Sequence, residues 1–303
     1  MTAGAHGLPP RAVVVSRATE LEELLRRHGT RAQAAFFLAS RGREIEELEE
    51  RHRVVRAALT DVLAAVPLRW RRALVGRDDL DRFLFEPEDV VVAVGQDGLV
   101  ANVAKYLDGQ IVVGVNPSRA MFDGVLARHE PKRAADLLEA ATSPRAKVES
   151  RTMVEAIAGD GQRLLALNEV FIGHRSHQSA RYVLAFGGAR ERQSSSGVVV
   201  ATGTGATGWA RSIAADRKEP IALPAPAARE LAFFVREAFP SVATTRSITQ
   251  GCIEHDGALV VASEMNEGGV AFGDGIEGDG IDLYFGQELR VRPAPGALRL
   301  LAA

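Results

Sequence analysis

The stretch Val90-Val-Val-Ala-Val-Gly-Gln-Asp-Gly-Leu-Val100 decides how this chain is expected to fold. Its opening residues are β-branched or small and uncharged, which is typical of a parallel strand buried on both faces. Asp97 follows between two glycines, and the pattern then becomes helical. In open α/β sheets, ligands gather at the carboxyl ends of strands, where a helix N-terminus offers backbone donors to phosphate. The stretch predicts a phosphate-facing turn; the alternative is an ordinary strand-to-helix turn with an N-capping aspartate.

Strand-like and helix-like patterns alternate on both sides of this stretch. Compact apolar runs at 11–16 and 111–115 are typical of further buried strands. Helix-like patterns cover 30–65, 99–107 and 133–141. This alternation predicts a doubly wound α/β domain, which we assign to residues 1–146.

From about Lys147 the pattern changes to short strands separated by turn residues. The clearest strands are expected at 164–167, 169–172, 181–186 and 197–201. Asp256-Gly257 predicts a two-residue hairpin, and further turns are expected at Gly268-Gly269, Asp274-Gly275 and Asp279-Gly280. We therefore expect a mostly antiparallel β domain over 147–303, with the last residues free to return to the N-terminal domain.

Composition narrows the class of protein. Lys and Arg number 37 against 39 Asp and Glu in 303 residues, so no overall positive charge favours nucleic acid or an anionic membrane. Cys252 is the single cysteine, which excludes an intrachain disulfide and favours a reducing compartment. No run of about eighteen apolar residues is present to span a bilayer. We expect a cytoplasmic protein with no nucleic-acid or membrane partner, acting on a small or anionic metabolite.

Several segments resemble motifs of the NAD kinase family, in the family's order along the chain. Gly95-Gln-Asp-Gly-Leu99 resembles the Gly-Gly-Asp-Gly-Thr signature that NAD kinases share with phosphofructokinases and lipid kinases. Leu167-Asn-Glu-Val170 resembles the family's Asn-Glu motif. The stretch 195–209 resembles its glycine-rich substrate loop, in the Thr-Gly-Thr-Gly form ending in tryptophan that is typical of mitochondrial-type members. The segment from 286–293 through 298–300 is similar to the family's closing strands.

This resemblance implies a fold and an activity. The fold would be an α/β Rossmann-like N-terminal domain followed by a mostly antiparallel β-sandwich, as in NAD kinases and diacylglycerol kinases, with the active site between them. The activity would be magnesium-dependent transfer of a phosphoryl group from ATP to the 2'-hydroxyl of the adenosine ribose of NAD, which gives NADP. A homodimer or a higher homo-oligomer is also implied.

The resemblance assigns roles to individual residues. Asp97 would be the catalytic aspartate, with Gly95, Gln96 and Gly98 shaping the phosphate-facing turn. The residues that would bind the dinucleotide are Asn168, Glu169, Thr202, Thr204, Gly205, Thr207 and Trp209. No protein metal site is predicted, because His174 and His177 lie three residues apart without an obvious third ligand.

The chain also departs from the family pattern. Gln96 stands in place of a glycine, Leu99 in place of a threonine, and Ala206 in place of the usual serine. Leu99 removes a hydroxyl that would have bonded phosphate or capped the helix. Two alternatives therefore stay open: a related kinase that phosphorylates another nucleoside, a sugar or an inositol, and a nucleotide-sensing protein without turnover.

Overall fold

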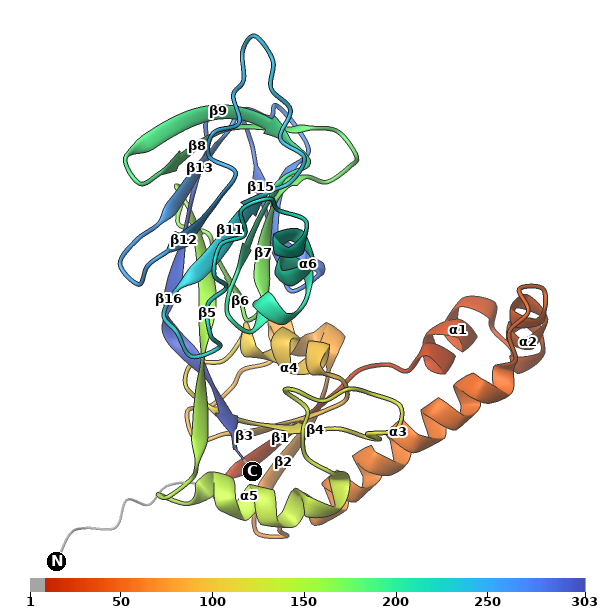
Figure 1. The fold of residues 1–303 in the computed structure, drawn as a ribbon. Helices are drawn as coiled ribbons and strands as arrows, with labels where there is room; N and C mark the ends of the chain where they lie inside the picture. Colours follow the sequence, from red (N-terminus) through yellow and green to blue (C-terminus); the bar gives the residue numbers. More distant parts are fainter. Residues whose placement is uncertain (1–8, 303) are drawn as a thin grey trace, which may run out of the picture. The chain divides into compact units, whose positions relative to one another are not determined.

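The computed structural model describes residues 9–302, which form two compact units (Figure 1). The first unit extends to Val148 and includes the C-terminal residues from Arg299. The second unit is Glu149–Leu298. No helix among the described residues is long and apolar enough to cross a membrane.

The first unit is built on a parallel sheet. Its elements are β1 (Arg11–Ser16), α1 (Glu20–His28), α2 (Arg31–Ala39), α3 (Ile45–Ala65), β2 (Arg71–Gly76), the 3₁₀ helix η1 (Arg77–Arg82), β3 (Val90–Val94), α4 (Asp97–Ala104), β4 (Ile111–Val115), the 3₁₀ helix η2 (Pro131–Arg133) and α5 (Ala134–Thr142). The strands pair in the order β2-β1-β3-β4, all in parallel. Arg299 and Leu300, at the end of β16 (Glu288–Leu301), pair in parallel with β4.

Every residue of β3 is buried, as expected for an inner strand of a parallel sheet. Val90, Val92 and Val94 join a core cluster with residues of α3 and α5, and α4 lies on the other face of the sheet (Figure 1). Because parallel strands end at one edge, the turn after β3 and the loop after β4 both begin at the carboxyl edge of this sheet.

The single helical segment expected over 30–65 is wrong. The chain forms two helices, α2 and α3, separated at 40–44. Gly42 lies in this break with a φ of 68°, a left-handed conformation that helical residues do not adopt. Leu38 of α2 and Leu48 of α3 then pack together with α1 in a small separate core.

The second unit is an antiparallel β-sandwich. Its elements are β5 (Val148–Ala158), β6 (Arg163–Ala166), β7 (Glu169–His174), β8 (Ala180–Phe186), β9 (Ala189–Ser195), β10 (Val198–Ala201), the 3₁₀ helix η3 (Gly205–Thr207), α6 (Trp209–Ala215), β11 (Leu231–Val235), β12 (Gln250–Ile253), β13 (Leu259–Ser263), β14 (Gly269–Gly273), β15 (Ile276–Leu283) and most of β16. One sheet has the order β12-β11-β10-β7-β14-β15. The other contains β16-β13-β8-β9, with β5 pairing with β16 and β6.

Side chains from both sheets of the second unit form one core. Tyr182 and Leu184 of β8 pack in the same cluster as Val170 and Ile172 of β7 and Phe233 of β11, all buried. Alternating inward-facing residues on two facing sheets are the signature of a sandwich. The expected fold class, an α/β unit followed by an antiparallel β-sandwich, is confirmed.

The turn predictions had mixed outcomes. Asp274-Gly275, with φ values of 53° and 71°, joins the antiparallel pair β14 and β15 as expected. Asp256-Gly257 does not close a hairpin, because β12 belongs to one sheet and β13 to the other. Neither of its residues is among the described residues with positive φ, which a type I′ hairpin turn requires. Asp279-Gly280 lies inside β15, next to a register shift, and is not a turn between strands.

Candidate functional site

Asp97 lies where β3 leads into α4. The turn is tied to the neighbouring strand, since Gly95 N donates to Val115 O at 3.0 Å. Gly98 is exposed, and nothing lies within 4 Å of the position that a Cβ would occupy on it. Leu99 is only 5% exposed and points inward. The turn therefore presents an open backbone outward, while the leucine that replaces a threonine serves as a core residue.

The Asp97 carboxylate accepts hydrogen bonds from three consecutive backbone N–H groups, an arrangement that we call the first carboxylate clamp. Oδ1 accepts from Leu126 at 2.9 Å and from Ala127 at 2.8 Å. Oδ2 accepts from Val125 at 2.9 Å. A carboxylate has about four acceptor sites, so one site remains on Oδ2. Asp97 thus holds a loop and can still accept one further donor.

The clamped segment belongs to the loop 116–129, which the sequence reasoning did not single out. Asn116, 1% exposed, braces this loop from within by donating from Nδ2 to Phe122 O at 3.0 Å. The local signal was Asn116-Pro117 directly after an apolar strand, a pair that marks turns. Nothing in the sequence connects that turn with Asp97.

Asp274 forms a second carboxylate clamp, in the second unit. Its Oδ1 accepts from Asn168 N at 2.7 Å and Glu169 N at 3.2 Å, and its Oδ2 accepts from Leu167 N at 2.8 Å. Asp274 N donates back to Glu169 O at 3.1 Å. These bonds fix the backbone of the Asn168-Glu169 turn at the start of β7.

The Glu169 side chain is half-buried beside this clamp. Burial raises the pKa of Glu169 to about 7, and the negative charge of Asp274 acts in the same direction. The carboxyl group is therefore protonated below about pH 7 and ionised above it. An ionised Glu169 accepts strong hydrogen bonds from hydroxyl groups, whereas the protonated form accepts weaker ones.

Thr202 ties the Asn168-Glu169 turn to the glycine-rich loop. Its hydroxyl donates to Leu167 O and accepts from Thr204 N at 3.1 Å and Gly205 N at 3.2 Å, and Thr202 N donates to Asn168 O at 2.9 Å. The residue is fully buried. One donor and two acceptor sites are the full capacity of a hydroxyl, so Thr202 supports the loop and its hydroxyl has no capacity left for a ligand.

Close packing and a buried arginine complete this region. A Cβ on Gly205 would lie 2.2 Å from Asn168 O, so only glycine fits there. Arg151 is 8% exposed, and its guanidinium donates to Thr204 Oγ1 at 3.5 Å and to Glu149 Oε2 at 3.1 Å. Within residues 9–302, Arg151 Nε is buried without a hydrogen-bond partner.

Thr207, Gly208 and Trp209 are the exposed members of the loop. The indole stacks on Phe171 with ring centroids 5.9 Å apart and planes inclined by 17°, and Arg236 lies 5.2 Å from the indole centroid. Thr207 Oγ1 donates to Thr204 O at 3.0 Å. Trp209 therefore presents a braced apolar ring at the surface.

The predicted residues fall into two groups. Gly95, Gln96, Asp97 and Gly98 form one turn of the first unit. Asn168, Glu169 and the loop 202–209 lie in direct contact in the second unit, although more than thirty residues separate them along the chain. Asp274 and Arg151, which hold the second group, were not predicted as site residues. No group of three or more His, Cys, Asp or Glu residues able to hold a metal ion occurs in the part of the chain that the structure describes.

Comparisons with known proteins place this geometry in context. No protein-family model matches the chain. A NAD kinase from Chloroherpeton thalassium (strain ATCC 35110 / GB-78) is 25% identical over 168 residues, which are 54% of this chain and 56% of that protein. The chain thus matches about half the length of this curated relative.

A solved structure matches over nearly the whole chain. The crystal structure of yeast NADH kinase complexed with NADH covers 97% of this chain, and the match extends over 84% of that one. The TM-score is 0.61 and the sequence identity is 16%. At this identity the match establishes the two-domain fold.

Proposed function

We propose that this chain transfers the terminal phosphoryl group of ATP to the 2'-hydroxyl of the adenosine ribose of NAD. Its sequence match and its fold support membership of the NAD kinase family. The product is NADP. One observation carries the proposal: the Asn168-Glu169 turn and the loop 202–209 are hydrogen-bonded into one rigid surface. This surface offers a carboxyl group, a hydroxyl and an indole, which suit a ribose and an adenine.

In this proposal the second unit binds the dinucleotide. Ionised Glu169 accepts hydrogen bonds from ribose hydroxyls, and Asn168 adds an amide beside it. Trp209 offers its exposed ring to the adenine, while Thr202 and Asp274 hold the turn without touching the ligand. Arg151 supports the loop from its buried side by donating to Thr204 Oγ1.

The turn of the first unit supplies the chemistry. The remaining acceptor site on Oδ2 of Asp97 takes the proton of the attacking hydroxyl, which is the role of a general base. Two of the three clamping bonds go to Oδ1, and all three fix the orientation of the carboxylate before substrate arrives.

Magnesium is implied by the family resemblance and fits these residues in one way. This ion is commonly bound through one or two carboxylates, with water and substrate phosphates as its other ligands. Because the remaining acceptor site of Asp97 is assigned to the attacking hydroxyl, the ion would be held mainly by water and the substrate phosphates beside this turn, and no cage of three acidic or histidine side chains occurs among the described residues. When bound, the ion supplies positive charge that offsets the triphosphate.

One departure favours a second candidate acceptor. Gln96 is exposed at the turn, so its amide adds hydrogen-bonding groups where the family has a glycine. A nucleoside, sugar or inositol hydroxyl is the second acceptor class that this side chain favours. The resemblance also favours a homodimer or a higher homo-oligomer, and the single cysteine favours a cytoplasmic location.

A panel of acceptors tests the proposal. Purified protein is incubated with ATP, magnesium and one of NAD, NADH, adenosine, glucose or inositol; products are identified by mass, and the phosphorylated position by NMR. We expect NAD to exceed sugars and inositols by as much as about ten-thousandfold, because a site built for hydrogen bonds rejects ligands that lack them. A preferred sugar, inositol or nucleoside would overturn the NAD assignment. Binding of NAD without any product would favour the nucleotide sensor.

A further inference from the structure

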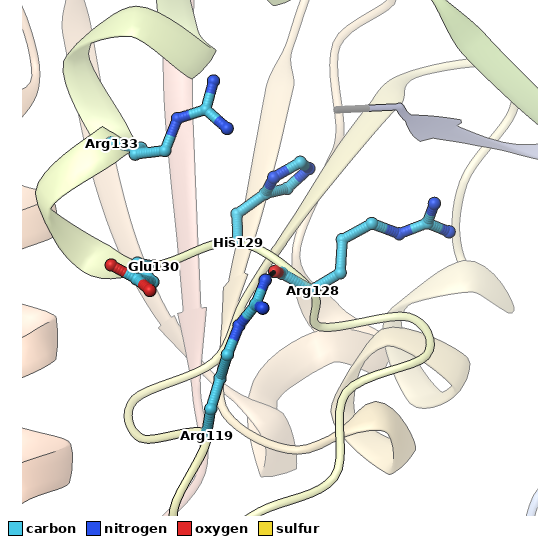
Figure 2. Close-up of a pocket in the computed structure, with 5 residues that line it drawn as sticks. All are labelled: Arg119, Arg128, His129, Glu130 and Arg133. Carbon is cyan, nitrogen blue, oxygen red and sulfur yellow. Dashed lines mark hydrogen bonds between the residues drawn. The ribbon is translucent and has the colours of Figure 1, made fainter.

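A basic pocket in the first unit is not used by the proposed function. Figure 2 shows the residues that line it, which are Arg119, Arg128, His129, Glu130 and Arg133. The cavity measures about 240 Å³. Drug-sized ligands occupy pockets of about 300 to 1,000 Å³, so this one suits a phosphate or diphosphate group better than a whole nucleotide.

Positive charge dominates the pocket. Burial lowers the pKa of His129, and the charges of Arg128, Arg133 and Arg119 lower it further, against a hydrogen bond to Leu301 O that raises it. The ring is therefore neutral at pH 7, and the positive charges of the three guanidinium groups disfavour its protonation. Glu130 is the one carboxylate in the lining. Neither Arg119 nor Arg133 forms an ion pair with a carboxylate within residues 9–302.

The pocket is held by a fixed backbone. His129 N donates to Gly114 O at 3.1 Å and His129 O accepts from Asn116 N at 2.8 Å, so this residue is attached to the end of β4. His129 Nε2 lies 3.2 Å from Leu301 O. Arg119 donates to the backbone carbonyl of Arg128, which orients its guanidinium at the pocket. The lining is thus positioned before a ligand arrives, which lowers the entropic cost of binding.

Asp97 also holds the loop that contributes Arg119, Arg128 and His129 to the pocket. The segment that the first carboxylate clamp holds is 125–127, and Arg128 and His129 are the next two residues. The hydrogen bonds to Asp97 therefore fix the backbone directly before Arg128 and His129. Guanidinium groups bind phosphate oxygens through paired, charge-assisted hydrogen bonds.

We propose that Arg119 and Arg133, over His129, form a binding site for a phosphate or diphosphate group of a small phosphorylated ligand. The ligand has two potential sources with the same chemistry: the phosphoryl donor of the proposed reaction, or a separate phosphorylated metabolite. Binding requires no turnover, so a test of this site does not depend on the proposed kinase activity.

Calorimetric titration with pyrophosphate, without magnesium and at constant ionic strength, tests the site. The double variant Arg119→Gln/Arg133→Gln is compared with the control Arg72→Gln/Arg145→Gln, which removes the same charge from exposed arginines elsewhere in the first unit. We expect the pocket variant to bind pyrophosphate about tenfold or more weakly, and the control to bind like the native chain. Each single variant should show an intermediate loss, which keeps the test valid if the double variant folds poorly.

NMR of the His129 ring tests whether pyrophosphate binds in this pocket, and competition with ATP tests the source of the phosphate group. Pyrophosphate should shift the His129 ring resonances in the native chain and not in the pocket variant. If ATP displaces pyrophosphate, the pocket holds the donor's phosphates; if both bind together, it holds a separate ligand. Either result supports the site. Equal affinity of the native chain and the pocket variant, or unchanged His129 resonances at saturation, would overturn it.

Discussion

The two units of this molecule use the same device for different ends. In each, one aspartate accepts three consecutive backbone N–H groups, two on Oδ1 and one on Oδ2. Asp97 clamps 125–127, a segment with no predicted ligand residue, whereas Asp274 clamps 167–169, which includes Asn168 and Glu169. In the proposed reaction, the carboxylate of the first clamp is itself the reacting group. The second clamp positions another carboxylate.

The same substitution at both aspartates separates a structural role of the carboxylate from a chemical one. An Asp to Asn change at either clamp keeps one acceptor oxygen and replaces the other with an amide that faces a backbone N–H. The structural cost should therefore be similar at both sites, about 1 to 3 kcal/mol for an unsatisfied buried group. Any difference in turnover beyond that cost reports the chemical role of Asp97.

The largest expected effect is that of Asp97→Asn on turnover. It removes the carboxylate proposed as general base, a contribution typically worth about a hundredfold or more. We expect kcat for NADP formation to fall by at least about a hundredfold in a coupled assay. Turnover within threefold of the native enzyme would remove Asp97 from the mechanism.

Glu169→Ala should mainly affect the dinucleotide. Loss of charge-assisted hydrogen bonds costs about 1.5 to 3 kcal/mol, so KM for NAD should rise by about ten- to a hundredfold, while KM for ATP changes little. Initial rates over a grid of both substrates measure the two constants. An equal rise in both would show that Glu169 does not discriminate between them.

Glu169 should also give NAD binding a pH dependence. With a pKa of about 7, Glu169 gains its charge as pH rises, so KM for NAD should fall about tenfold from pH 6 to pH 8. Glu169→Gln should flatten this profile, because the amide does not titrate in this range. A profile in Glu169→Gln identical to that of the native enzyme would assign the titration to another group.

Asp274→Asn should have a smaller effect of a distinctive kind. The change loosens the Asn168-Glu169 turn and removes the negative charge that helps to raise the pKa of Glu169. We expect KM for NAD to rise by about three- to tenfold, and the midpoint of its pH dependence to move to lower pH. A purely structural role would weaken binding without moving the midpoint.

The smallest expected effect concerns the unusual turn. Leu99→Thr shortens a side chain that is 5% exposed, so the free energy of unfolding should fall by about 1 to 2 kcal/mol in urea titrations. Gln96→Gly alone alters an exposed residue and should leave that free energy nearly unchanged.

Both variants should keep turnover on NAD within about threefold if the departures are neutral; a larger loss would show that they are adaptations.

Sequence reasoning worked where the determinants are local. The apolar run of β3, the Asp97 turn and the glycine-rich loop are each contained in a short segment, and the fold class followed from their alternation with other strands and helices. The Asp256-Gly257 error has the same origin, because a local pair cannot tell a hairpin from a link between two sheets.

What the sequence did not reveal depends on distant partners. Asp274 was predicted only as a turn residue, and it is one, but its bonds to the Asn168-Glu169 turn join residues more than a hundred positions apart. Arg151 meets Thr204 in the same way, across 53 positions. Such pairs leave no periodicity and no dipeptide signal, so only the folded arrangement discloses them.

The most direct test measures single-turnover NADP formation by Asp97→Asn and Asp274→Asn side by side, at saturating ATP and NAD, with the melting temperature of each variant recorded. The two changes are chemically identical and remove equivalent clamping bonds, so similar melting temperatures make each the control for the other. We predict a rate at least about thirtyfold lower for Asp97→Asn than for Asp274→Asn. Equal rates at equal melting temperatures would show that both aspartates only brace the fold, and would contradict the assignment of Asp97 to the reaction.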